Sequence, residues 1–67
     1  MGKLLIRVDG ALTDELTNAF PSLSSRRGHG ETTLVGDLAD QEELLGVLNM
    51  LNALGVAVIE VVTIPED

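Results

Sequence analysis

The feature that most constrains this chain is residues 40–64, which combine a helix start, a glycine stop and a strand. Asp40 is a typical N-cap residue, and Glu43 stands three positions later, at the spacing of a capping box. The apolar side chains that follow recur every three or four residues, as on one face of a helix: Leu44, Val47, Leu48, Leu51 and Leu54. Gly55 is the expected left-handed terminator. The sequence therefore predicts a helix over residues 40–54.

The run after this glycine, residues 56–64 (VAVIEVVTI), predicts a strand that ends at Pro65. Its β-branched side chains are stiff at χ1 and favour extended backbone over helix. One assignment of faces turns the following residues towards the helices: Ala57, Ile59, Val61 and Thr63. A register slip of one residue would reverse every one of these side chains.

The beginning of the chain predicts a strand and a short helix. Apolar and polar residues alternate over residues 3–9, as in a half-buried strand, and an Asp-Gly turn follows. Thr13 or Asp14 then caps a helix that runs to about Ala19. This helix ends before Pro21, because the residue that precedes a proline is disfavoured in helical backbone.

The middle of the chain predicts a hairpin. Residues 23–27 form a weak strand that we expect at the edge of a sheet, residues 28–30 form the turn, and residues 31–35 form the returning strand. The full order is then strand, helix, strand, strand, helix, strand. This order predicts one α+β domain over residues 1–67, a ferredoxin-like βαββαβ fold. Its four-stranded antiparallel sheet has the spatial order 4-1-3-2, with two helices on one face.

Length and charge narrow the classes of function. A chain of 67 residues without cysteine has a marginal core and no disulfide, so association is one remaining source of stability. The net charge of −7 opposes binding to nucleic acid or to an anionic membrane, both of which need a basic surface. The chain has no apolar run of about 20 residues to span a membrane and no stretch typical of a signal peptide. We therefore expect a cytoplasmic protein.

The outer face of the predicted helix suggests an interface. Residues 44–59 carry no charged side chain, although a solvated helix of an acidic protein usually has Lys and Glu there. The outer face holds small, amide and apolar residues instead: Leu45, Gly46, Asn49, Met50 and Ala53. The small residues would let another backbone approach closely. The alternative is that the larger apolar residues only widen the core stripe.

The sheet face opposite the helices offers a second candidate interface. Leu5, Val58 and Val62 would form an apolar patch there, and exposed patches of this kind often mark association sites. An Arg7–Glu60 cross-strand pair on the same face would contribute at most about 1 kcal/mol if exposed.

One polar cluster could hold an anion. Arg26, Arg27 and His29 precede or occupy a glycine-rich turn. The alternative for the cluster is a solvated hairpin tip. A single histidine and the absence of cysteine predict no metal site, no cofactor and no catalytic set, so we expect no enzyme.

Several segments carry a resemblance to known proteins. Residues 19–23 (AFPSL), residues 33–48 (TLVGDLADQEELLGVL) and the Leu54-Gly55 pair before a Glu-containing strand together resemble a group of short, uncharacterised actinobacterial proteins. More distantly, the topology is similar to that of ACT domains, which bind small ligands at dimer interfaces. The segment of residues 9–12 (DGAL) loosely matches their glycine turn, and this resemblance implies a small ligand near Asp9 and Gly10.

Two functions follow as hypotheses. The first is a non-enzymatic interaction module that self-associates, with a dimer favoured and a different protein as the alternative partner. It would use the helix face, the open sheet face, or both. The second is an ACT-like regulatory domain that binds a small anionic or amino-acid ligand.

Overall fold

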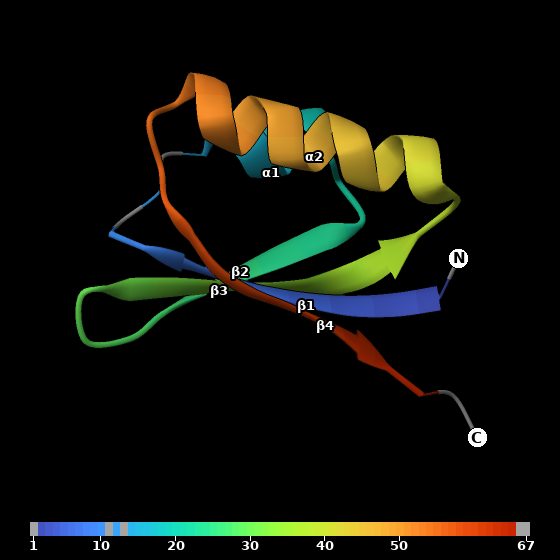
Figure 1. Cartoon of the computed structure of the whole chain (residues 1–67), viewed down its shortest axis with the longest axis horizontal. Coiled ribbons are helices and arrows are strands. Elements are labelled where there is room, and N and C mark those ends of the chain that lie inside the picture. The colour runs from blue at the N-terminus through green and yellow to red at the C-terminus, as the bar shows by residue number, and fades with distance from the viewer. Residues whose placement is uncertain (1, 11, 13, 66–67) are drawn as a thin grey trace.

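The computed structural model, which describes residues 2–10, 12 and 14–65, contains one sheet and two helices (Figure 1). In chain order the elements are β1 (Gly2–Asp9), α1 (Glu15–Ala19), β2 (Leu23–Arg27), β3 (Glu31–Leu38), α2 (Gln41–Ala53) and β4 (Val58–Ile64). Every pairing is antiparallel, and the strand order is β2-β3-β1-β4. Both helices lie on the same side of the sheet (Figure 1). The predicted α+β class, antiparallel four-stranded sheet and two helices are confirmed.

The start of α2 uses the predicted capping residues with one difference. Asp40 has extended backbone, and its carboxylate accepts a hydrogen bond of 2.9 Å from the backbone N–H of Glu43. The Glu43 side chain accepts in return from the N–H of Ala39 at 3.1 Å, rather than from that of Asp40 itself. The reciprocal bond thus ties down the residue before the cap, and it fixes the path by which β3 enters the helix.

The end of α2 explains why the last strand begins later than predicted. Gly55 has a φ of +74°, as a left-handed terminator requires. Its N–H donates to the carbonyl of Asn52, and the N–H of Val56 donates to that of Leu51, both at 3.0 Å. These two bonds define a Schellman motif. Because Val56 completes this motif, it lies outside β4, which starts at Val58 rather than at residue 56.

The return strand of the hairpin, β3, is three residues longer than the predicted range of 31–35. Its last residues continue the ladder with β1, where Gly36 pairs with Leu4 and Leu38 pairs with Gly2. A glycine usually weakens a strand, but here it permits a close approach. A Cβ atom built on Gly36 would overlap the carbonyl oxygen of Ser22, in the turn that precedes β2.

The first helix, α1, is a single short turn with an unusual start. Asp14 occupies the N-cap position, but its backbone is helical and its side chain makes no capping bond, so the predicted Asp14 cap is wrong. Thr13, the alternative cap, lies outside the described residues. The hydroxyl of Thr17 donates to the Asp14 carbonyl at 3.2 Å, and the N–H of Phe20 donates to the Leu16 carbonyl at 2.9 Å.

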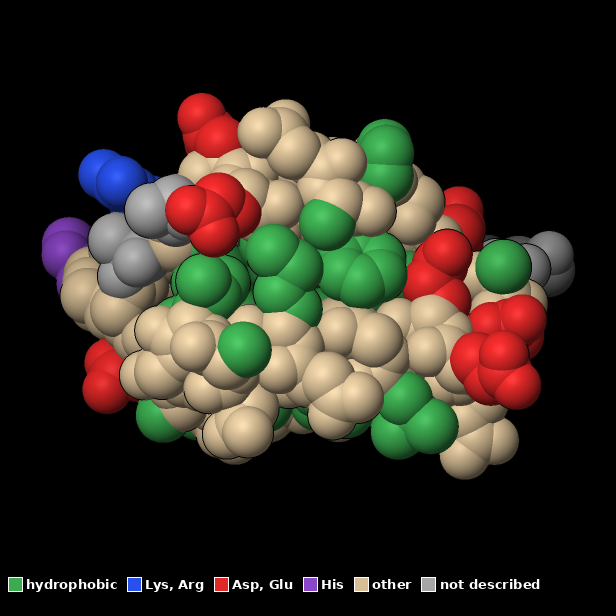
Figure 2. Space-filling view, turned by 90° about the horizontal axis from the view of Figure 1, so that it is seen from above, with side chains coloured by type: hydrophobic (Ala, Val, Ile, Leu, Met, Phe, Trp, Pro, Cys, Tyr) green, Lys and Arg blue, Asp and Glu red, His purple; other side chains and the backbone are tan. Residues whose placement is uncertain are grey.

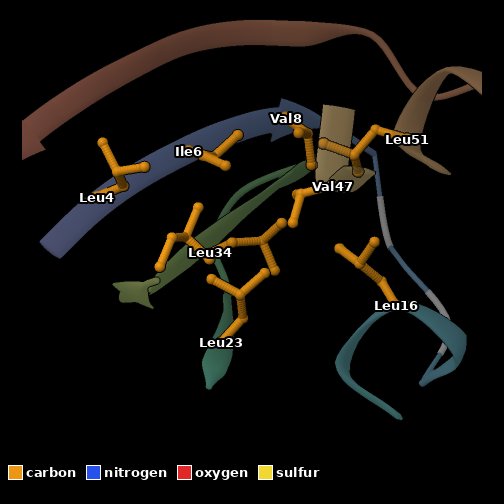
Figure 3. Close-up of a cluster of buried hydrophobic side chains, with 9 residues drawn as sticks. Leu4, Ile6, Val8, Leu16, Leu23, Leu34, Val47 and Leu51 are labelled. Atoms are coloured by element: carbon orange, nitrogen blue, oxygen red, sulfur yellow. The ribbon is translucent and has the colours of Figure 1, made fainter. Parts of the chain in front are cut away.

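The core lies between the helices and the first three strands (Figure 3). Its buried side chains are Leu4, Ile6, Val8, Leu16, Leu23, Leu34, Leu38, Val47 and Leu51. Among the described residues Thr32 is the buried polar side chain, and its hydroxyl donates to the Gly10 carbonyl at 2.8 Å. The predicted core position Leu54 is wrong, because this side chain is 37% exposed. Leu54 is the C-cap residue that follows α2.

The last strand, β4, pairs with β1 as predicted, but it is not covered, and Val58 lies opposite the buried Val8 and not on the open sheet face where we predicted it. Val61 lies opposite Ile6 and Thr63 opposite Leu4, so these side chains do share the face that bears the helices. They are nevertheless exposed, as is Ile59, whereas we expected them to be packed against the helices. The reason is the position of the helices. On this face α1 contacts β2 and α2 contacts β3, so both helices lie over the half of the sheet that is farther from β4.

Candidate interaction surfaces

The edge strand β4 is the largest departure from the usual burial of an apolar strand. Four of its side chains are exposed to similar extents: Val58 at 40%, Ile59 at 43%, Val61 at 42% and Val62 at 41%. They point to both sides of the sheet. No described strand pairs with the outer side of β4, which is last in the strand order. This edge therefore offers another chain both a row of main-chain hydrogen-bond donors and acceptors and two apolar faces.

This edge carries few of the features that normally protect one. Protective edges use lysines, inward-pointing charges, prolines or bulges. Glu60 is the only charged residue in β4, and its carboxylate lies 3.3 Å from a guanidinium nitrogen of Arg7 in the neighbouring strand. This confirms the predicted cross-strand pair. A register shift near Ile59, where the pairing steps from Glu60 to Val58, is a bulge at one end of the strand.

The outer face of α2 is only partly available. Leu45 is 51% exposed, and Asn49 and Ala53 are exposed as well. Met50 is half-buried and packs against the core. A Cβ atom on Gly46 would lie 3.4 Å from the ring of Phe20, so this glycine accommodates an aromatic side chain of its own chain. Close approach at Gly46, which we predicted for a partner, is thus used for internal packing.

Figure 2 shows the helix-bearing side, where hydrophobic side chains gather in a band across the middle and acidic side chains lie around its margin. Some half-buried hydrophobic residues that pack on the core come from the helices and their connections: Leu12, Phe20, Leu44, Leu48 and Met50. Much of the uncharged character of α2 is therefore explained within the chain.

The opposite sheet face holds a depression of about 660 Å³ over β1, β2 and β3. Leu5 and Val35 contribute its apolar surface. Hydroxyl-bearing side chains come from Ser22, Ser24 and Thr33, and charges come from Lys3, Arg26 and Asp37, whereas Ser25 lies opposite the buried Leu34 and so directs its side chain to the other face. Within the described part of the chain neither basic side chain of the depression forms an ion pair, in contrast to Arg7, which pairs with Glu60 and lies 3.8 Å from Glu31. The depression can therefore attract a small anion.

The predicted ligand residues do not converge. Arg26 lies opposite Thr33 and lines the depression, whereas Arg27 lies opposite the buried Thr32 and so belongs to the other face of the sheet. His29 is exposed at the hairpin turn. The pattern of two adjacent arginines therefore does not produce a two-guanidinium site.

The predicted location at Asp9 and Gly10 is closed by internal hydrogen bonds. The N–H of Gly10 donates to the Gly30 carbonyl at 2.7 Å, and the N–H of Asp9 donates to the Ala57 carbonyl at 2.9 Å. The turn after β1 is thereby attached to the β2–β3 hairpin at the same end of the sheet (Figure 1). Neither residue lines the depression.

Sequence reasoning missed the hydroxyl-lined depression and underestimated the exposure of β4. The serines of β2 entered the prediction only as part of a weak edge strand, although alternation places Ser24 with Arg26 on the open face. Among the described residues, no group of three or more potential metal ligands occurs, and no helix is long and apolar enough to cross a membrane.

These features define a class of protein: a small α+β domain with a cysteine-free aliphatic core and an uncovered edge strand. A family model described as a domain of unknown function (DUF8691) matches residues 4–62. The chain belongs to this family, and the match extends from β1 into β4. No curated protein matches the chain, and neither does any solved structure.

Proposed function

We propose that this chain is a ferredoxin-like, non-enzymatic interaction module that self-associates in the cytoplasm. The element order and the strand order β2-β3-β1-β4 support the ferredoxin-like assignment, since a split β-α-β fold interleaves its strands in this way. The function is carried by one observation, the exposure of β4 on both faces and along its outer edge.

Association through β4 is favourable for two reasons. Full burial of a Val or Ile side chain contributes about 1.5–3 kcal/mol, so covering one that is about 40% exposed contributes about 1 kcal/mol. Strand addition also supplies main-chain hydrogen bonds. The outer face of α2, through Leu45, and the open sheet face are the other two candidate surfaces. The helix face is the weaker candidate, because Gly46 and Met50 already pack inside the chain.

The test is the mass in solution, measured by light scattering over a wide range of protein concentration. We expect the parent chain to be a dimer that dissociates on dilution. Val61→Lys places a charge on the exposed edge and should shift dissociation to much higher concentration. Leu45→Lys and Ser24→Lys add the same charge to the outer face of α2 and to the opposite edge strand, and they should leave the dimer intact.

Each alternative has its own result. If Leu45→Lys alone dissociates the dimer, the helix face is the interface. A parent chain that is monomeric at every concentration refutes self-association. Circular dichroism of each variant shows whether the fold is retained, which we expect because all three positions are exposed.

A second function, an ACT-like domain that binds a small anionic or amino-acid ligand, is favoured by the depression on the open sheet face. Lys3 and Arg26 supply positive charge there without an ion pair to another described residue, and hydroxyl groups surround them. A carboxylate or phosphate group would find both charge and hydrogen-bond donors at this place.

Thermal unfolding with a panel of small carboxylates, amino acids and inorganic phosphate at constant ionic strength tests this function. A ligand that binds only the folded chain raises the melting temperature. Arg26→Gln should abolish the rise, whereas Arg27→Gln, which changes the same charge on the other sheet face, should retain it. An equal effect of both variants would indicate general screening of charge and would contradict a site in the depression.

A further inference from the structure

The outer edge of β4 constrains how two copies of the chain can meet. We propose that two copies pair antiparallel through β4, with a two-fold axis through Val61, and form one continuous sheet. This inference rests on the proposed self-association and adds its partner, geometry and register. Within the second copy, the edge that pairs is β4 and not β2, because the two edges of the sheet differ in chemistry.

The opposite edge, β2, is a poor partner for β4. It is short and polar, and its exposed residues are Ser24, Ser25, Arg26 and Arg27. Pairing β4 with β2 of another copy would place two arginines beside an apolar strand, and it would leave free edges that allow a filament to grow. Pairing β4 with β4 is self-complementary and closes after two copies.

Symmetry then limits the register. Directly opposed residues of an antiparallel pair point to the same face of the sheet. Two identical strands can therefore pair only where one residue lies directly opposite the same residue of the partner. The two-fold axis then passes midway between these two copies, and we call this an axis through that residue. In the middle of β4 the candidates for this central residue are Glu60, Val61 and Val62.

Charge disfavours the axis through Glu60. It would place this carboxylate directly opposite the same carboxylate of the partner, and like charges in that position are destabilising. The Arg7 guanidinium on each side already pairs with its own Glu60 and lies near Glu31, so it supplies no additional cation. An axis through Val61 or Val62 sets each Glu60 opposite an apolar residue instead.

Length selects Val61 from the two that remain. β4 has seven residues, Val58–Ile64, and Val61 is the middle one. An axis there keeps Ile59 in the paired region, opposite the partner's Thr63, whereas an axis through Val62 leaves both Val58 and Ile59 without partners; Val58, which the bulge turns to the helix-bearing face, has no partner with either axis. On the helix-bearing face the axis through Val61 sets Val61 against the partner's Val61, and Ile59 against the partner's Thr63. The bulge near Ile59 then lies at both ends of the interface and not at its centre.

The absence of cysteine makes disulfide trapping a direct test of the register. Single variants Glu60→Cys, Val61→Cys and Val62→Cys are oxidised under mild conditions, with Ser24→Cys and Leu45→Cys as exposed controls on other surfaces. Opposed residues have Cβ atoms about 4.5–5.5 Å apart, close to the spacing of about 3.5–4.5 Å in a disulfide. We expect Val61→Cys to cross-link fastest and almost completely, and the other four to cross-link slowly.

The outcomes separate this inference from the proposed function. A dimeric mass with fastest cross-linking at Glu60→Cys or Val62→Cys overturns the register. A dimeric mass with fastest cross-linking at Leu45→Cys or Ser24→Cys overturns pairing through β4 while self-association stands. A monomeric mass overturns both.

Amide hydrogen exchange on the unmodified chain gives a second measurement that no substitution can disturb. Raising the protein concentration through the dissociation range should slow exchange at β4 amides, because their outward N–H groups become bonded to the partner. Amides of β2 provide the control and should not change. Slowing at β2 with none at β4 would overturn the proposal.

Discussion

Gly36→Ala is the substitution whose cost follows most directly from the structure. Gly36 lies in the middle of the sheet and pairs with Leu4 on one side and Leu23 on the other. A Cβ atom at this position would overlap the carbonyl oxygen of Ser22, and it would lie 2.9 Å from the carbonyl carbon of Ser22 and 3.0 Å from the Cα atom of Leu23. All three contacts are with backbone, so no side-chain rotation relieves them.

The magnitude follows from this geometry. Overpacking a core by a methyl group typically costs 1–3 kcal/mol, and relief here requires moving the turn before β2 away from β3, so we expect about 3 kcal/mol. A domain of this length has a free energy of unfolding of about 3–10 kcal/mol. The variant should therefore lose a large part of its stability. Its melting temperature should fall by about 12–24 °C at about 4–8 °C per kcal/mol.

The assay is urea unfolding followed by circular dichroism, because the chain has no Trp or Tyr for fluorescence. Gly28→Ala is the matched control. A Cβ atom there meets nothing closer than the Glu31 carbonyl at 3.9 Å, and Gly28 does not have a positive φ. Both variants are compared with the parent at one protein concentration. A change of less than about 0.5 kcal/mol for Gly36→Ala, the range of ordinary surface substitutions, would refute the steric argument.

Three further substitutions, the last with a matched control, test the fold by urea unfolding. Asp40→Ala removes the N-cap bond of α2 and should cost about 1 kcal/mol, and an unchanged midpoint would show that the cap contributes nothing. Thr32→Val removes the buried hydroxyl that donates to the Gly10 carbonyl and should cost about 1–3 kcal/mol, whereas a more stable variant would contradict that bond. Leu51→Ala should cost about 2–5 kcal/mol and clearly more than Leu54→Ala, and equal costs would contradict the burial of Leu51 and the exposure of Leu54.

The parts of the fold that the sequence predicted well are those set by local chemistry. The N-cap of Asp40, the left-handed Gly55 and the helix between them depend on neighbours a few residues away. The strand over residues 23–27 and its turn are likewise local. The Arg7–Glu60 pair shows that a correct strand order also predicts cross-strand neighbours.

The errors concern where elements lie relative to one another. The apolar pattern of Ile59 and Val61 predicted burial, because such residues usually face a covered layer. Their exposure depends on which strands the two helices cover, and the residue pattern of β4 does not determine where the helices lie. The same holds for Gly46, where the partner in close packing is Phe20 from a distant part of the chain.

The candidate ligand residues are separated in the structure for a related reason. Arg26 and Arg27 are adjacent in sequence, and a cluster of charges suggested one site. Adjacent residues of a strand point to opposite faces, however, so strand formation separates them. The depression instead combines Arg26 with Lys3, which only the strand order brings to the same sheet face.

The exposure of β4 links the stability of the chain to its association. The strand is held by its ladder with β1, by the short connection from α2 and by the ion pair to Arg7, while the core side chains come from the other elements. Opening of β4 would therefore uncover few buried contacts, and it should be one of the least costly local openings of the fold. In the proposed dimer, a second copy that pairs with β4 would stabilise the folded chain at this point and not in the core. Because the paired form would exist only in the folded state, the proposal predicts that stability rises with protein concentration. A domain with a small core and an open apolar edge would then gain from association what a larger domain obtains from burial alone.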